Sequence, residues 1–187
     1  TAAGYHVIVA RAPADDRPLC CGRTFLATGM VERAKAEAER MIDALLPHLA
    51  RGLPIIGLEP SCLYTLRDEF QSLRLGPGAK QLAEAAMSFE DFVVRERDAG
   101  RWKLAFKPIE AKQALLHGHC HQKAFGAMGS VEAVLALVPE LKVSAIESSC
   151  CGMAGAFGYE AAHYATSMKM AEAALLPAVR KSDAGAI

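Results

Sequence analysis

The chain has 187 residues, of which 52% are hydrophobic and 22% charged, and its 21 basic and 21 acidic side chains cancel. This length is enough for one medium domain or two small ones, while zero net charge and a single Trp argue against a nucleic-acid partner. With no apolar run of bilayer length and no visible N-terminal leader, we expect a cytoplasmic protein without a membrane span, peripheral attachment at the inner face being left open.

The first half alternates between expected strands and helices. Residues 5–10 predict a short buried strand, and apolar residues at helical spacing predict a helix over 28–46. A second strand is expected at 54–58, leading into a helix that ends near residue 71. Two further helices should follow Gly76, the second opened by Ser88 and Asp91 at the spacing of a capping box.

The polar stretch 98–108 is the expected boundary between two modules, residues 1–100 and 101–187. After it, a strand at 114–117 should precede a helix, and a strand at 143–146 should precede a long helix over 160–176. Strands that each lead into a helix predict an α/β fold of two repeated Rossmann-like βα modules with parallel strands.

The cysteines carry most of the chemical information. They are Cys20, Cys21, Cys62, Cys120, Cys150 and Cys151. Neighbouring cysteines have Cα atoms about 3.8 Å apart, which is too close for a good disulfide. Clustered cysteines in a chain without secretory features point instead to metal binding or redox chemistry. Each cysteine is expected just past the C-terminal end of a strand and near a helix N-terminus, where α/β folds place their sites and the helix dipole favours thiolate.

The tripeptide Cys-Cys-Gly occurs twice, at 20–22 and at 150–152. Adjacent thiolates can hold or bridge metals, and the following glycine allows the backbone to turn tightly around such a site. Soft sulfur ligands select iron–sulfur clusters, zinc or copper(I). The alternative is that the six cysteines are buried structural residues.

Four segments carry a family resemblance: residues 19–23, 58–62, 117–121 and 149–155. Together they resemble the cysteine-rich CCG-domain family of iron–sulfur oxidoreductases. Their residues are most similar to the C-terminal part of proteins that fuse an FAD-linked oxidase to an iron–sulfur region and oxidise 2-hydroxy acids.

The resemblance implies an electron-transfer module with an iron–sulfur cluster of [4Fe-4S] type, non-cubane in some members. The ligands that it implies are Cys20, Cys21 and Cys62 in one half, and Cys120, Cys150 and Cys151 in the other. It also implies a partner domain or subunit that carries FAD, together with an electron acceptor that the sequence does not identify. We do not expect this chain to turn over substrate alone.

Supporting roles are expected for residues around the cysteines. His119 and His121 could hydrogen-bond a cluster sulfur or move a proton. Arg23 could lower a thiol pKa or neutralise cluster charge, and Gly22 and Gly152 allow the turns.

The sequence departs from the full family pattern in both halves. The first half has no cysteine upstream of Cys20, and Glu59 stands where a Cys-x-x-Cys partner of Cys62 would be. The second half has no cysteine downstream of Cys151. We therefore expect the second module to be truncated, with a strand that begins near Ala186 leading to a further cysteine.

Two other functions remain open at this point. A zinc-stabilised interaction module would bind zinc in place of a cluster and would unfold when a chelator removes it. A metal-free protein of thiol–disulfide exchange would instead show a thiol of low pKa.

Overall fold

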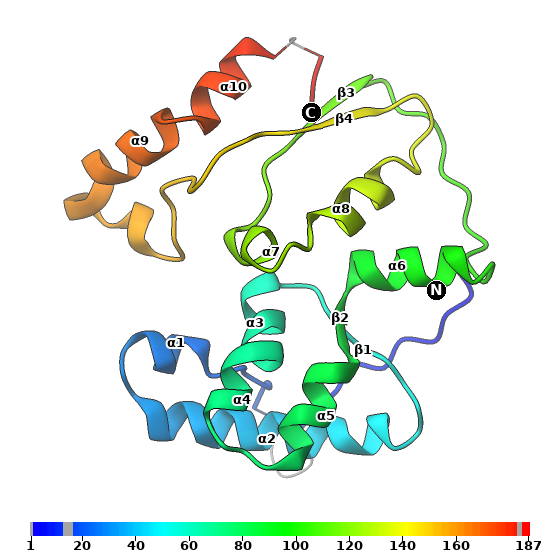
Figure 1. Ribbon diagram of the computed structural model, residues 1–187, viewed down its shortest axis with the longest axis vertical. Coiled ribbons are helices and arrows are strands. Elements are labelled where there is room, and N and C mark those ends of the chain that lie inside the picture. Colours follow the sequence, from blue (N-terminus) through cyan, green and yellow to red (C-terminus); the bar gives the residue numbers. More distant parts are fainter. Residues whose placement is uncertain (1, 13–16, 183–184) are drawn as a thin grey trace. The chain divides into compact units, whose positions relative to one another are not determined.

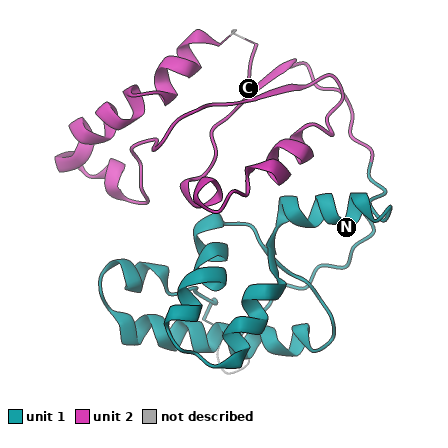
Figure 2. Cartoon of the chain, in the orientation of Figure 1, with its two compact units in different colours: residues 1–104 teal, residues 105–187 magenta. Residues whose placement is uncertain are grey.

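The computed structural model describes residues 2–12, 17–182 and 185–187. The chain divides into two units, residues 1–104 and 105–187, shown in teal and magenta in Figure 2. The division falls within the polar stretch 98–108. That each unit is a CCG module stays a prediction.

Helices make up most of unit 1 (Figure 1). In chain order its elements are α1 (Arg23–Ala27), α2 (Val31–Leu49), β1 (Ile55–Gly57), α3 (Pro60–Tyr64), the π-helical turn η1 (Thr65–Glu69), α4 (Phe70–Ser72), α5 (Pro77–Ala85), β2 (Ala86–Ser88) and α6 (Phe89–Asp98). The helices expected after Cys62 and after Gly76 are therefore present.

The longest helix, α2, packs one face into the core. Buried positions recur every three or four residues along it, at Ala34, Ala38, Ile42 and Leu45. The helix begins three residues later than the sequence predicts and continues through Pro47 to Leu49. Pro47 lacks the N–H that would donate to the Asp43 carbonyl, but the helix ends two residues later, so the loss affects only its last turn. The turn beyond it still closes, since the Ala50 N–H donates to the Leu46 carbonyl at 2.9 Å.

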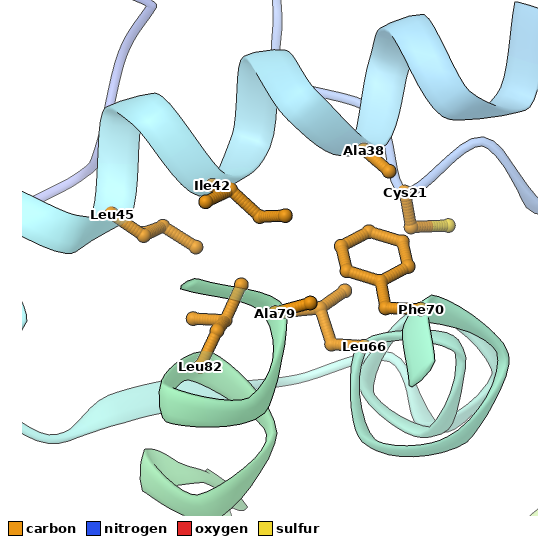
Figure 3. Close-up of a cluster of buried hydrophobic side chains, with 8 residues drawn as sticks. All are labelled: Cys21, Ala38, Ile42, Leu45, Leu66, Phe70, Ala79 and Leu82. Atoms are coloured by element: carbon orange, nitrogen blue, oxygen red, sulfur yellow. The ribbon is translucent and has the colours of Figure 1, made fainter. Parts of the chain in front are cut away.

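The core of unit 1 lies between α2 on one side and η1, α4 and α5 on the other (Figure 3). Its buried members are Cys21, Ala38, Ile42, Leu45, Leu66, Phe70, Ala79 and Leu82. Figure 3 shows Cys21 at one end of this cluster, next to Ala38 and the ring of Phe70. The hydrophobic core therefore fixes the position of a candidate site residue.

The sheet of unit 1 pairs β1 with β2 in parallel, from Ile55 opposite Ala86 to Gly57 opposite Ser88. The strand expected at 54–58 is present, shorter by one residue at each end. Its partner β2 was not predicted, because three residues between two helices give too short a pattern to detect. β2 ends at Ser88, which is also the N-cap of α6.

The strand expected at residues 5–10 is wrong. These residues, all of them described, form no strand, and Val7 and Val9 are 64% and 78% exposed. The segment is held by Tyr5, whose hydroxyl donates to Glu96 of α6 at 3.0 Å. Apolar residues alone therefore do not make a strand here, because this segment pairs with neither β1 nor β2.

The missing strand at residues 5–10 changes how the first two cysteines are positioned. Cys62, Cys120 and Cys150 follow β1, β3 and β4 in the chain, as expected, but Cys20 and Cys21 follow no strand. The position of these two is set by α2 and the core instead of by a strand end.

The capping box at the start of α6 is confirmed. The Asp91 N–H donates to Ser88 Oγ at 3.0 Å, and the Ser88 N–H donates to the Asp91 carboxylate at 3.4 Å. Two backbone donors at the helix start thereby gain acceptors.

Unit 2 contains a second two-stranded parallel sheet. Its elements are β3 (Gln113–Leu116), α7 (Cys120–Ala124), α8 (Met128–Leu135), β4 (Lys142–Ala145), the 3-10 turns η2 (Phe157–Tyr159) and η3 (Ala161–His163), α9 (Tyr164–Glu172) and α10 (Leu175–Lys181). β3 pairs with β4 from Gln113 opposite Lys142 to Leu116 opposite Ala145.

The long helix expected over 160–176 is wrong in its extent. Two 3-10 turns occupy residues 157–163, and the helix is interrupted between Glu172 and Leu175. The backbone of Ala174 leaves the helical region there, with φ −151°. Periodicity alone does not report such a break, because the apolar residues on either side keep their helical spacing.

Ile187 extends the sheet of unit 2. Its N–H donates to the Gln113 carbonyl at 3.0 Å, and the Leu115 N–H donates to the Ile187 carbonyl at 2.8 Å. This is the bonding pattern of a parallel pair, and it uses residues of β3 that alternate with those bonded to β4. Ile187 therefore lies beside β3 on the edge opposite β4. The further cysteine expected beyond it stays a prediction.

Unit 2 has few buried apolar side chains. Among the residues that the structure describes beyond Leu104, those that are buried and hydrophobic are Ala114 and Ala171. Within the described ranges, no helix is both long and apolar enough to cross a bilayer.

Candidate functional site

The first Cys-Cys-Gly turn is anchored on α2 by a buried ion pair. Glu37, only 7% exposed, accepts from Arg17 at 2.6 Å and from Arg40 at 3.0 Å. The Arg40 guanidinium also donates to the carbonyls of Arg17 and Pro18, at 2.5 and 3.2 Å. The backbone that leads into Cys20 is thus held against one face of α2.

Gly22 allows the closest approach in this turn. Its φ is +77°, and a Cβ at this position would lie 2.8 Å from the Ala34 carbonyl oxygen of α2. The Gly22 N–H donates back to Cys20 Sγ at 3.4 Å. A glycine is required here by both the left-handed backbone and the contact, and the turn directs one N–H at a sulfur.

Cys21 and Cys62 form the closest thiol pair. Their Sγ atoms share a hydrogen bond at 3.1 Å, although the two residues are 41 positions apart. Cys21 is buried in the core, whereas Cys62 is exposed in the first turn of α3. Glu59 is the N-cap of that helix, and its carboxylate accepts from the Cys62 N–H at 2.6 Å.

The surroundings of the two thiols shift their pKa values in opposite directions. The hydrogen bond with Cys62 lowers the pKa of Cys21 to about 6; burial opposes this shift, and the backbone N–H of Arg23 adds to it. The same hydrogen bond raises the pKa of Cys62, and burial and the Cys21 charge raise it further. The two thiols therefore titrate as a coupled pair, in which negative charge is favoured on Cys21.

The guanidinium of Arg23 is engaged elsewhere. It forms an ion pair with Glu69 of η1 at 2.7 Å, while its backbone contributes to the low pKa of Cys21. Together with Leu26, Leu73 and neighbouring residues, this pair lines a pocket of about 330 Å³ beside α1.

The second Cys-Cys-Gly turn repeats the geometry of the first. Gly152 has φ +88°, and its N–H donates to Cys150 Sγ at 3.3 Å. A Cβ on Gly152 would lie 2.2 Å from the Ser167 carbonyl oxygen of α9. In each unit, therefore, a left-handed glycine packs on a helix backbone and donates to the first sulfur of the pair.

Polar contacts hold the loop after β4 to the segment after β3. The Ser148 hydroxyl lies 2.8 Å from Nδ1 of His117, and Lys123 Nζ donates to the carbonyls of Ser148 and Ser149 at 2.7 and 2.5 Å. These contacts fix the backbone directly before Cys150.

Cys120 is the first residue of α7 and is exposed. Partial desolvation raises its pKa, and the charges of Cys150 and Cys151 raise it further while Lys123 opposes them. Cys120 is therefore close enough to both other thiols of unit 2 for their charges to act on it.

The two histidines flank Cys120 at the start of α7. His119 is the N-cap of α7, and its Nδ1 accepts from the His121 N–H at 3.2 Å. The two rings are stacked with centroids 5.2 Å apart. Their placement shapes the start of α7, and a role toward a cluster stays a prediction.

The cysteine thiols suit a metal that prefers sulfur ligands, but the described residues do not bring three such ligands together. Each unit supplies three free thiols, the ligand type that iron–sulfur clusters and zinc prefer. Within the ranges that the structure describes, no group of three or more Cys, His, Asp or Glu side chains is arranged to hold a metal ion. The thiols are the ligand type that a cluster needs. The geometry shows two cysteine turns, each held within its own unit.

Several residues that build the site do not stand out in the amino-acid sequence. They are Glu37, Arg40, Ala34, Lys123, Ser148 and Ser167. Glu37 and Arg40 share a helix with ordinary surface charges, and only the tertiary fold shows that Glu37 is buried. Ala34 and Ser167 mark the places where Gly22 and Gly152 pack on the helices. The sequence does not show this packing, so these two small residues do not stand out.

A comparison with protein families bears on the first cysteine turn. Residues 8–67 match the family described as CCG, cysteine-rich domain. This range includes Cys20, Cys21 and Cys62, the three thiols of unit 1. The family resemblance drawn from the motifs is thereby confirmed.

The chain also shows a longer similarity to known dehydrogenases. The chain is 28% identical over 149 residues to a subunit of the anaerobic glycerol-3-phosphate dehydrogenase of Escherichia coli K12, a match that covers 79% of this chain and 37% of the relative. It is 27% identical over 149 residues to D-2-hydroxyglutarate dehydrogenase of the same strain, covering 77% and 14%. The Pantoea ananatis D-2-hydroxyglutarate dehydrogenase is 25% identical over 143 residues, covering 75% and 13%. The chain thus spans little more than a third of the first relative. No solved structure matches it.

Proposed function

We propose that this chain is the cysteine-rich electron-transfer part of a flavin-linked dehydrogenase. The proposed ligands for iron–sulfur binding of [4Fe-4S] type are Cys20, Cys21 and Cys62 within unit 1, and Cys120, Cys150 and Cys151 within unit 2. The observation that carries the proposal is the repeated turn, in which Gly22 and Gly152 each donate an N–H to a cysteine sulfur. The CCG match and the dehydrogenase relatives give it its context.

The residues of the chain prepare thiolates for such a ligand role. Metal-bound cysteine is deprotonated, so a group that stabilises negative sulfur favours binding. The hydrogen bond with Cys62 lowers the pKa of Cys21 to about 6, and backbone N–H groups donate to the sulfurs of Cys20 and Cys150. When bound, a cluster would supply one-electron transfer.

The partner in this proposal is a domain or subunit that carries FAD and oxidises a 2-hydroxy acid. Two of the relatives are named D-2-hydroxyglutarate dehydrogenases, which supports this substrate class. In such an assembly the chain would receive electrons from the flavin and pass them to an acceptor.

Anaerobic reconstitution tests the cluster. The full chain is incubated with iron and sulfide, desalted, and analysed for iron, acid-labile sulfide and visible absorbance. We expect iron and sulfide in near-equal amounts, and a loss of both in Cys150→Ser. Ser149→Ala is the matched control, because it keeps the backbone carbonyl that accepts from Lys123. Binding of zinc alone under these conditions, or equal loading of Cys150→Ser and the control, contradicts the proposal.

A further inference from the structure

The structure pairs two of the three thiols of unit 1 and leaves the third aside. The Cys21 and Cys62 sulfurs are 3.1 Å apart, whereas the Cys20 sulfur accepts from the Gly22 N–H. A disulfide has an S–S distance of about 2.0 Å, so the pair needs to close by about 1 Å. Rotation of the exposed Cys62 side chain in the first turn of α3 can supply such a movement.

The two cysteines also differ in access. Cys21 is 4% exposed and packs against the core, so an external reagent does not reach it. Cys62 is exposed. This is the arrangement of an attacking thiol at the surface with a resolving thiol behind it.

We propose that Cys21 and Cys62 form a reversible disulfide when unit 1 holds no metal, with Cys20 outside the bond. The oxidant is a low-molecular-weight disulfide such as oxidised glutathione. Cys62 passes its proton across the 3.1 Å hydrogen bond to the Cys21 sulfur and attacks one glutathione sulfur as a thiolate, which breaks the glutathione disulfide and releases one glutathione thiolate. Cys21 sulfur then attacks Cys62 sulfur and releases the second. Two cysteine thiols are oxidised, one glutathione disulfide is reduced, and the two cysteine protons pass to the released thiolates.

The bond has a consequence for metal loading that rests on the proposed function. A disulfide between Cys21 and Cys62 removes two of the three thiols of unit 1 as ligands and leaves those of unit 2 unchanged. Oxidation of the apoprotein should therefore reduce iron uptake, and a dithiol reductant should restore it.

The test uses the full apoprotein, stripped with a chelator and reduced, then equilibrated in glutathione buffers of increasing oxidised fraction. After acid quenching and alkylation, mass spectrometry identifies the linked peptides. Cys20→Ser is the matched control, because it removes the neighbouring thiol and makes the assignment to Cys21 unambiguous. We expect the Cys21–Cys62 link in the wild type and in this control, and a rise in Tm of roughly 10 °C that Cys62→Ser lacks.

Cys21→Ser separates the two steps. Without a resolving thiol, the mixed disulfide of Cys62 with glutathione should accumulate roughly tenfold above the wild-type level. Because Cys21 is buried, this variant could fail to fold, and the exposed Cys62→Ser then carries the comparison. A Cys20–Cys62 link, or a persistent Cys62–glutathione adduct in the wild type, overturns the proposal. Iron and sulfide loading of the reduced chain is measured separately, so a failure of the disulfide is distinguishable from a failure of the cluster.

Discussion

At the scale of single residues, the glycines of the two cysteine turns are the positions least open to change. Gly22→Ala places a Cβ 2.8 Å from a helix carbonyl on a left-handed backbone. Gly29 is the matched control, because it has φ +74° and nothing within 4 Å of its Cβ position. We expect Gly29→Ala to lower the free energy of unfolding by about 1–2 kcal/mol and Gly22→Ala by about 2 kcal/mol more. Urea denaturation measures both. Equal losses would mean that contact with α2 contributes nothing.

Another residue-scale prediction concerns Glu96, which anchors the N-terminal segment. Hydrogen bonds from Arg101, Tyr5 and Arg95 outweigh the effect of burial and lower the pKa of Glu96 from 4.5 to about 2. The folded pKa lies below the unfolded one, so the stabilisation is complete above pH 4.5 and is lost as the pH falls toward 2.

Glu96→Gln should therefore be less stable than the wild type at pH 7, and the difference should shrink steadily below pH 4.5. Denaturant unfolding across this pH range measures it. Glu84→Gln, which removes one partner of an exposed pair at 3.9 Å, is the control. A difference that is constant from pH 7 to pH 3 would rule out this role for Glu96.

At the scale of elements, local signals predicted those structures that depend on neighbours in the chain. The capping box at Ser88 was found because both of its hydrogen bonds join residues three apart. The strand at 5–10 was wrong because a strand also needs a partner, and this segment pairs with neither β1 nor β2 while Tyr5 is held by Glu96. The extent of the helix after Cys151 was wrong for a related reason, since its interruption at Ala174 leaves the apolar spacing intact.

The capping box gives an element-scale prediction. Ser88→Ala removes the acceptor for the Asp91 N–H and should lower the free energy of unfolding by about 1 kcal/mol. Thermal unfolding followed by circular dichroism measures the change. Ser72→Ala, an exposed serine at the end of α4, should change stability by less than about 0.5 kcal/mol. A Ser88 variant as stable as this control would show that other groups satisfy the start of α6.

At the scale of the whole molecule, the two units differ in how much apolar surface they bury. Unit 1 has a continuous core around Phe70 and Leu82, whereas the buried hydrophobic residues described in unit 2 are Ala114 and Ala171. Because apolar burial is the main favourable term in folding, we expect a fragment of residues 1–104 to unfold cooperatively. A fragment of residues 105–187 should show no cooperative transition. Calorimetry of the two fragments checks this, and a sharp transition in the second would contradict it.

The sequence by itself determined the six cysteines, the two Cys-Cys-Gly motifs and the family that residues 8–67 match. These follow from residue identity and short spacing, which survive without knowledge of the fold. Only the tertiary structure decided that Cys21 meets Cys62 and that Cys20 does not. That choice depends on α2, whose buried face fixes the first turn, and on Glu59, which caps the helix that carries Cys62. Contacts across 41 residues are set by packing, and no local pattern encodes them.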